Sequence, residues 1–280
     1  MLVTAVILSF NSEAYIQACL DSVVAAFQPL EDKCEIYIVD NGSTDSSRGL
    51  IEDLQRIHPN LIRPIFNARN LGTTVARNLA LKQARGRYLL VVDSDVVIPE
   101  NTLPVLIAAL EADPACGLVA PRLVYPDGRP QLSVDRFPSI GRKIARFLFL
   151  RRIERAKATQ PDGPQPVDYA ISAFWLFRRE ILSRLGGLDE RFFYAPEDAD
   201  FCASIWLSGW RVVYVSQAHA IHDARELSRR GIFNRFTLHH LVGLGRYFLK
   251  HRYLFSPRGL TRRIAKAQNA RASGDATPGT

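Results

Sequence analysis

The sequence predicts an α/β fold in which helices cover both faces of a mostly parallel β-sheet. In the first half of the chain, short runs of consecutive apolar residues alternate with longer segments whose apolar residues recur at helical spacing. The apolar runs lack the in–out alternation of a half-exposed strand, which indicates strands buried on both faces. Strands that alternate with helices in this way are typical of a parallel sheet, because each helix carries the chain back to the start of the next strand.

Four strand–helix pairs are expected in the first half. The strands are predicted at 2–10, 34–40, 61–66 and 87–93, and the helices at 11–27, 41–57, 73–84 and 99–113. Asn11 or Ser12 is expected to cap the first helix and Ser43 or Thr44 the second, because short polar side chains accept hydrogen bonds from the first turn. Gly86 fits the C-cap of the third helix.

The second half has a less regular pattern. Residues 125–130 (YPDGRP) predict a hairpin turn, and residues 136–166, which mix basic and bulky apolar residues before a Pro/Gly-rich end, predict a mobile or surface-lying insertion. A strand running into a helix is expected at 167–180, a helix within 195–210 and a strand at 211–222, followed by basic amphipathic helices from about Arg225. We therefore expect a domain over 1–222, a basic helical segment over 223–267 and a disordered tail over 268–280.

The positive charge of the chain is concentrated at its C-terminal end. The net charge is +8, yet residues 223–280 hold 12 Lys and Arg against 3 Asp and Glu, whereas residues 1–222 sum to −1. A basic segment of this kind suggests an anionic membrane surface, nucleic acid or an acidic substrate as partner, or only solvated charges. Nucleic acid is disfavoured because no recognition motif accompanies the basic residues. Residues 142–157 (RKIARFLFLRRIERAK) also suggest peripheral membrane contact, because a basic amphipathic helix can lie in the interface, or else these helices pack on the domain with solvated charges.

The cysteines and the apolar runs favour a cytoplasmic protein. Cys19, Cys34, Cys116 and Cys202 are scattered without a CxxC pair, which indicates small buried residues in a reducing compartment. The apolar residues 2–10 lack the basic flank and cleavage site of a secretory signal. No apolar run reaches the length of a membrane span. We expect a cytoplasmic location, with contact on the inner face of the membrane as an option.

Two aspartates follow the fourth predicted strand. Asp93 and Asp95 flank Ser94 in the stretch VVDSDVV. Since ligands of such sheets bind beyond the carboxyl ends of the strands, the two carboxylates can hold a hard divalent cation together with substrate phosphates. Alternatively, they form hydrogen bonds in a turn or cap the next helix.

A second acidic group opens the predicted helix within 195–210. Acidic residues in a first helical turn complement the helix dipole, and this alone explains Glu197, Asp198 and Asp200. The helical spacing nevertheless places Asp198 on the apolar side and Asp200 on the polar side. Partial burial would raise the pKa of Asp198 and suit a general base.

Three further residues are open to two interpretations. Asp40, at the end of the second strand, can bind a base edge or simply belong to a turn and helix cap. Arg77 can face a diphosphate or lie as a solvent-exposed charge on its helix. His222 can complete a metal site, although most single histidines are structural.

Five stretches in a fixed order carry a resemblance to a known family. The ordered set resembles the family 2 glycosyltransferases with a GT-A fold, in particular their bacterial rhamnosyltransferase-like branch, over residues 3–222 and also 246–252. The stretches are SFNSEAYIQACLDSV, EIYIVDNGSTDSS, NLGTTVARNLALKQARGRYLLVVDSDVVIPE, ISAFWLFRREILSRLGGLDERFFYAPEDADFCASIWLSGW and AHAIH.

The resemblance implies a role for each matching residue. Asp198 would be the catalytic base, and Glu197 would orient or contact the acceptor. Asp95 and His222 would bind Mg²⁺ or Mn²⁺, and Asp93 would contact the ribose or the metal. The residues expected to bind the nucleotide sugar are Ser9, Phe10, Asn11, Asp40, Asn41, Gly72, Arg77, Asp93 and Ser94.

The implied activity is inverting, metal-dependent transfer of a hexosyl or deoxyhexosyl group. The donor would be a UDP-, dTDP- or GDP-sugar, and the acceptor would be a hydroxyl of a glycan or a lipid-linked compound in cell-envelope synthesis. One alternative is a non-catalytic module that binds nucleotide sugars. Another is a sugar nucleotidyltransferase, which would need a glycine-rich and basic phosphate loop after the first strand, where the sequence has SFNSEAY.

Overall fold

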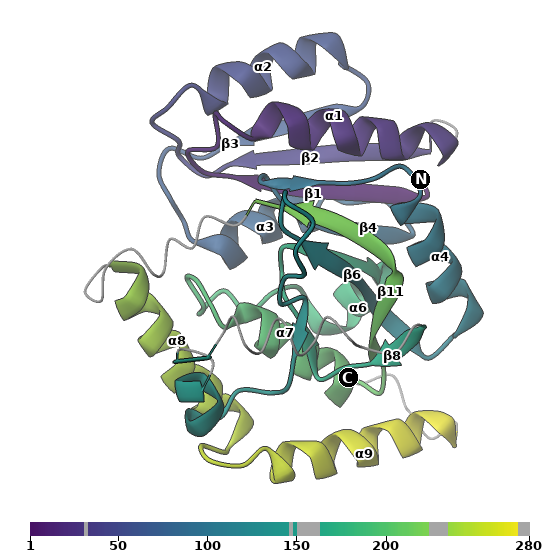
Figure 1. Cartoon of the computed structure of the whole chain (residues 1–280), viewed down its shortest axis with the longest axis vertical. Coiled ribbons are helices and arrows are strands. Elements are labelled where there is room, and N and C mark those ends of the chain that lie inside the picture. Colours follow the sequence, from purple (N-terminus) through teal and green to yellow (C-terminus); the bar gives the residue numbers. More distant parts are fainter. Residues whose placement is uncertain (31–32, 146–147, 150–162, 224–234, 274–280) are drawn as a thin grey trace.

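The structure is a computed structural model that describes residues 1–30, 33–145, 148–149, 163–223 and 235–273. Strands and helices alternate along its first half, as predicted (Figure 1). The strands are β1 (Val3–Ser9), β2 (Cys34–Asp40), β3 (Ile62–Phe66), β4 (Tyr88–Asp93), β5 (Val96–Val97), β6 (Cys116–Val124), β7 (Val134–Asp135), β8 (Pro164–Pro166), β9 (Tyr169–Ala170), β10 (Phe174–Arg178) and β11 (Arg211–His222). The helices are α1 (Ile16–Phe27), α2 (Ser47–Ile57), α3 (Thr73–Leu81), α4 (Thr102–Ala112), α6 (Arg179–Leu185), α7 (Glu197–Leu207), α8 (Arg235–His251) and α9 (Arg258–Ala272), with a 3₁₀ turn, η1, at Gln28–Leu30.

In the described part of the chain, nine strands form one central sheet. Its order is β3-β2-β1-β4-β10-β6-β11-β5, with β8 paired on β11, while β7 and β9 form a separate two-stranded sheet. The first four strands are mutually parallel, and β10 lies antiparallel between β4 and β6. The predicted mostly parallel α/β sheet is confirmed.

Helices cover both faces of this sheet. Helices α1, α2 and α4 pack on one face, where Ile16 and Leu20 meet Ile7. Helices α3, α6, α7 and α9 pack on the other, where Ala76 and Ala80 meet Val91. Because both faces are covered, the strands are apolar along their whole length. The four cysteines are buried free thiols, as expected.

The carboxyl ends of the central strands lie in register. Ser9 at the end of β1 is paired with Asp40 at the end of β2, and Leu8 is paired with Asp93 at the end of β4. Polar residues that follow different strands therefore meet at one edge of the sheet, where ligands of such folds bind.

Some helices begin or end at other residues than predicted, because residues expected at their caps make contacts elsewhere in the structure. Helix α1 begins only at Ile16 and α2 at Ser47. The Asn11 side chain instead accepts a hydrogen bond from the Thr44 backbone N–H at 2.9 Å, and so joins two strand-end loops. Helix α3 ends at Leu81, well before Gly86. A Cβ at Gly86 would clash with the backbone nitrogen of Thr4 in β1, so close backbone packing explains that glycine.

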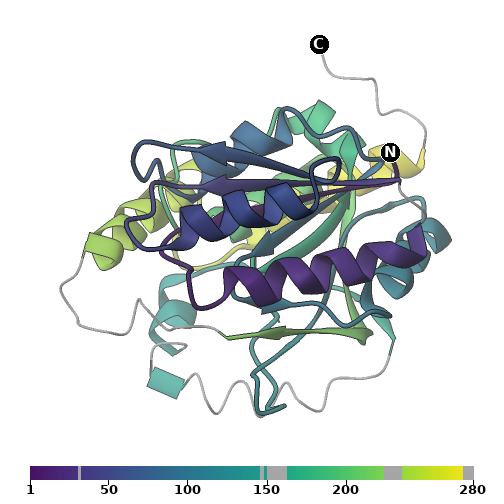
Figure 2. The same cartoon turned by 90° about the horizontal axis from the view of Figure 1, so that it is seen from above.

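The C-terminal helices are joined closely to the rest of the protein. Asp200 of α7 accepts a hydrogen bond from Lys250 at 2.7 Å and lies 2.8 Å from Nε2 of His251, both in α8. Leu260 of α9 belongs to the core that covers one face of the sheet. Helices α8 and α9 lie at the opposite end of the molecule from α1 and α2 (Figure 1), and α8 lies at the left-hand side in Figure 2.

Two predictions about irregular segments need correction. The end of the expected insertion forms β8, which pairs with β11 as an edge strand of the sheet, and residues 140–145 are helical. The predicted disordered tail was placed too early, because α9 continues to Ala272. Residues 146–147, 150–162 and 274–280 lie outside the described part of the chain. Among the described residues, no helix is both long and apolar enough to cross a membrane.

Candidate active site at the carboxyl ends of the strands

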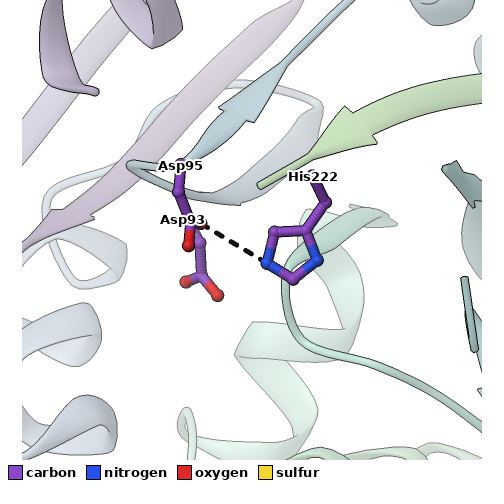
Figure 3. Close-up of side chains that lie close together, drawn as sticks. All are labelled: Asp93, Asp95 and His222. Carbon is purple, nitrogen blue, oxygen red and sulfur yellow. Dashed lines mark ion pairs between the residues drawn. The ribbon is translucent and has the colours of Figure 1, made fainter. Parts of the chain in front are cut away.

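Asp93, Asp95 and His222 form a cluster that could hold a metal ion. One potential ligand atom from each residue lies within 4.8 Å of the others, and the three side chains converge from the ends of β4 and β11 (Figure 3). The short strand β5 pairs with the end of β11, so that Val96 lies opposite His222. This pairing brings a histidine distant in sequence beside the two aspartates.

The donor atoms of this cluster suit a hard divalent cation. Oδ1 of Asp95 is buried and has no hydrogen-bond partner among the described residues, although it lies 3.4 Å from Nε2 of His222. Nδ1 of His222 lies 2.7 Å from Oε1 of Gln131. A proton on Nδ1, donated to Gln131, leaves the Nε2 lone pair facing Asp95, as metal-binding histidines require. Carboxylate oxygens with an imidazole fit Mg²⁺ or Mn²⁺.

The electrostatics of the cluster favour added positive charge. Burial raises the pKa of Asp93, and the Asp95 charge raises it further, although Arg77 opposes both effects. Burial lowers the pKa of His222, but the nearby charges of Asp95, Asp93 and Asp223 outweigh burial, so the pKa is raised. The raised pKa of His222 and the effect of the Asp95 charge on Asp93 indicate local negative charge, which a cation would neutralise.

Arg77 lies behind this cluster, in a buried position. Its guanidinium is 2.5 Å from Oδ1 of Asp93 and donates to the Ser172 carbonyl at 3.1 Å. Only 1% of the residue is exposed, so the alternative of a solvent-facing helix charge is wrong. Loops from the second half of the chain cover helix α3. The local sequence around Arg77 does not reveal this burial.

Glu197 is more buried than Asp198, opposite to the expectation from helical spacing. Oε1 of Glu197 accepts a hydrogen bond from Ser172 at 2.9 Å and lies 3.6 Å from Arg77. Burial, together with the Asp198 charge, raises the pKa of Glu197 to about 7. Asp198 is only half-buried, in the first turn of α7.

Asp200 also differs from the prediction, which placed it on the polar side of its helix. It is 2% exposed, because α8 covers that side of α7 and supplies Lys250 and His251 as partners. The buried acids of α7 are therefore Glu197 and Asp200, and Asp198 is the most accessible of the three.

The residues expected to contact the nucleoside lie at the ends of β1 and β2. Ser9 is buried, and its hydroxyl has no hydrogen-bond partner among the described residues. Asp40 is also buried and accepts hydrogen bonds from the backbone N–H and the hydroxyl of Ser43. Phe10 is exposed, and Asn11 has a left-handed φ of 51°.

Three other predicted binding residues hold the loops of the site together. Asn41 accepts a hydrogen bond from the Leu71 backbone N–H at 3.0 Å and so fixes the loop before α3. Gly72 has a φ of +86°, and a Cβ there would lie 2.7 Å from the Phe193 carbonyl oxygen. The Ser94 hydroxyl lies 2.7 Å from that of Ser12. Each of these contacts positions the backbone around the crevice.

The sequence analysis missed three residues of the site. Gln131 orients His222, and Ser172 contacts both Arg77 and Glu197. Tyr194 has its pKa raised to about 12 by burial and by the charges of Glu197, Asp93, Asp198 and Asp95, so its phenol stays protonated near four carboxylates. Tyr194 could have been noted from its position just before the acidic motif, whereas nothing local marks Gln131 or Ser172.

Comparisons with known proteins identify the family of the chain. A family model described as Glycosyl transferase family 2 matches residues 4–186. The chain is 28% identical over 229 residues to the N-acetylglucosaminyl-diphospho-decaprenol L-rhamnosyltransferase of Mycobacterium tuberculosis, covering 75% of this chain and 73% of that protein. It is 32% identical over 244 residues to the undecaprenyl-phosphate 4-deoxy-4-formamido-L-arabinose transferase of Aeromonas hydrophila, covering 87% of this chain and 65% of that one.

Solved structures share the fold. The mannosyltransferase PcManGT from Pyrobaculum calidifontis, in complex with GDP-Man and Mn²⁺, is similar with a TM-score of 0.62 at 20% identity, covering 99% of this chain and 76% of that one. S. aureus TarS 1-349 has the same TM-score and identity, covering 98% and 72%. The expected GT-A fold is confirmed, and the sugar nucleotidyltransferase alternative is wrong. With the family model matching well over half of its length, the chain belongs to glycosyl transferase family 2.

Proposed function

We propose that this protein is an inverting, metal-dependent glycosyltransferase. It transfers a hexosyl or deoxyhexosyl group from a nucleoside diphosphate sugar to a hydroxyl of a lipid-linked glycan acceptor. The observation that carries the proposal is the cluster of Asp93, Asp95 and His222 at the sheet edge, beside the acidic start of α7. A metal site and an accessible carboxylate at one crevice are the two parts that such a transfer requires.

The relatives support the classes of donor and acceptor. Solved neighbours were crystallised with UDP-GlcNAc or with GDP-Man and Mn²⁺. The names of two curated relatives specify a diphospho-decaprenol and an undecaprenyl-phosphate. We therefore place the protein at the inner membrane face, where polyprenyl-linked acceptors would be reached.

Each part of the site has a role in this transfer. Asp95 and His222 would hold Mg²⁺ or Mn²⁺, which supplies positive charge to the departing diphosphate. Arg77 fixes the carboxylate of Asp93 through its ion pair. Oδ1 of Asp95, in contrast, has no hydrogen-bond partner among the described residues. Ser9 and Asp40 lie where β1 and β2 end and would face the nucleoside.

Asp198 would act as the general base. It accepts the proton of the acceptor hydroxyl as the acceptor oxygen bonds to the anomeric carbon and the bond from that carbon to the diphosphate oxygen breaks. A single displacement from the opposite face inverts the anomeric configuration, with the same carboxylate role as in inverting glycosidases. The buried Glu197 supports this arrangement through Ser172 and Arg77.

A donor screen tests the proposal. UDP-, dTDP- and GDP-sugars should each be tested for a rise in melting temperature with Mn²⁺ and again with EDTA. We expect at least one nucleotide sugar to stabilise the protein only when the metal is present, because binding to the folded state alone raises its stability. Stabilisation by none of them, or equal stabilisation in EDTA, would contradict the proposal.

A further inference from the structure

Helix α8 presents apolar residues on two opposite faces. One face packs inward through Gly243, Tyr247 and His251, which are spaced four residues apart and buried. The opposite face carries what we call the outer row of α8, which consists of Leu238, Leu241, Val242 and Leu249 with exposed fractions of 63%, 61%, 44% and 81%. At 100° per residue, the four side chains of the outer row fall within about one third of the helix circumference.

An outer row of this kind is unusual on a surface helix. The stripe of apolar side chains on such a helix normally faces the core, and the other side is polar. Here the core-facing side is already formed by other residues, and four further large apolar side chains face solvent. Leu254 and Phe255, which follow α8 in the chain, are also exposed. Contiguous exposed apolar surface on a folded protein indicates an interaction site.

The segment that carries the outer row is strongly basic. Residues 235–273, which span α8 and α9, contain nine Lys and Arg and no Asp or Glu. The exposed members include Arg252, Arg258, Arg262, Arg263 and Lys266. Exposed apolar side chains in a segment whose charged residues are all cations match the two layers of an anionic membrane surface, with its acyl boundary and its negative headgroups.

We propose that the outer row of α8 docks onto an anionic lipid bilayer, with the helix lying in the plane of the interface. A second copy of the chain fits this surface poorly, because it would bring two sets of uncompensated cations together. Each cation held near anionic lipid strengthens membrane binding, so the charges and the apolar row act together.

The packing of α8 links this docking to the active site. A Cβ at Gly243 would clash with the Ala195 carbonyl oxygen, so α8 touches the chain just before Glu197. His239 of α8 stacks on Phe193 with ring centroids 4.3 Å apart. Docking of the outer row would therefore bring the start of α7, with Asp198, close to the lipid surface. This consequence rests on the proposed function, whereas the docking itself does not.

The experiment is vesicle flotation of the full chain. Vesicles of phosphatidylcholine with and without phosphatidylglycerol are compared for the native sequence and for the triple variant Leu238→Ser, Leu241→Ser, Leu249→Ser. We expect binding to the anionic vesicles only, and a loss of about tenfold or more in the triple variant. Ile57→Ser is the matched control, since Ile57 is an equally exposed apolar residue on α2 at the opposite end of the molecule, and it should bind as the native sequence does.

A second variant keeps the test informative if the triple variant folds poorly. Leu249→Trp should show extra fluorescence quenching by brominated lipid, compared with the native protein and its three tryptophans. The proposal is overturned if the native chain does not float with anionic vesicles, if the folded triple variant floats equally well, or if the introduced tryptophan is not quenched. It is also overturned if sedimentation shows a dimer that the triple variant abolishes and that does not bind vesicles.

Nucleotide binding separates this proposal from the proposed function. The triple variant should keep the thermal shift of the native protein with Mn²⁺ and a nucleotide sugar. A protein that floats but binds no nucleotide sugar would contradict the proposed function and leave the docking surface in place. A protein that binds a nucleotide sugar but does not float would contradict the docking surface and leave the proposed function in place.

Discussion

The buried guanidinium of Arg77 forms an ion pair with the partly exposed carboxylate of Asp93, with 2.5 Å between the guanidinium nitrogen and Oδ1. The pair joins α3 to the end of β4, immediately behind the proposed metal site. It also separates the roles of the two aspartates in VVDSDVV, because Asp93 is held by protein while Oδ1 of Asp95 has no hydrogen-bond partner within the described residues. For this reason we propose Asp95, more than Asp93, as the metal ligand.

Replacing Arg77 should destabilise the whole protein. Arg77→Met leaves the buried carboxylate of Glu197 and the half-buried carboxylate of Asp93 without their cation, and we expect a loss of about 3 kcal/mol in the free energy of unfolding. Urea unfolding measures the loss. Arg87→Met is the control, because Arg87 pairs with Glu111 at the surface and should contribute less than about 1 kcal/mol. Equal losses in the two variants would show that the ion pairs of Arg77 contribute no more to the free energy of unfolding than a surface pair does.

Asp198 should be required for turnover but not for nucleotide binding. Asp198→Asn should lower the turnover number about 100-fold or more while nucleotide binding is kept, because only the general base is lost. Transfer of radiolabelled sugar and thermal shift with nucleotide measure the two properties. Near-normal turnover in Asp198→Asn would remove the base assignment, and the exposed Asp53→Asn on α2 serves as the control.

The stability of the protein should depend on pH through Glu197. Burial and the Asp198 charge raise its pKa from 4.5 to about 7. Between these two pH values, Glu197 keeps its proton in the folded state and releases it in the unfolded chain. The resulting stabilisation of the folded state is fully present below pH 4.5 and is lost as the pH rises through 7. From pH 5 to pH 8, Glu197→Gln should therefore gain about 2 kcal/mol in unfolding free energy relative to the native protein. A difference that stays constant over this range in urea unfolding would refute the raised pKa.

Local pattern was sufficient to predict the strands and the sheet edge at which their polar ends meet. The apolar runs that end at Ser9, Asp40 and Asp93 are strands, and their ends lie in register. The combination of Asp95 with His222 was also predicted, and the structure brings them together through the pairing of β5 with β11. The strands follow from the periodicity of neighbouring residues, which sequence reasoning detects directly.

Contacts between distant segments could not be predicted in the same way. Asp200 has a sufficient local explanation in the helix dipole, yet its partners Lys250 and His251 come from a helix fifty residues later. Arg77 carries no sign of burial, because the residues that cover it belong to the second half of the chain. The side chains of Asn11 and Ser12 were predicted to cap a helix. They instead form hydrogen bonds with residues of other loops. Tertiary contacts override local preference at all of these positions.

Binding of the donor should depend on a metal ion held by Asp95. Isothermal titration calorimetry with the nucleotide sugar found by the thermal-shift screen should be run with Mn²⁺ and with EDTA on the native protein, Asp95→Asn and Asp127→Asn. Asp127 is an exposed aspartate in the turn at 125–130 and is the matched control. We predict that Mn²⁺ strengthens donor binding in the native protein and in Asp127→Asn, and that Asp95→Asn loses about tenfold or more of that affinity. Donor binding that is the same in Asp95→Asn, or that does not respond to Mn²⁺ in the native protein, would contradict the account.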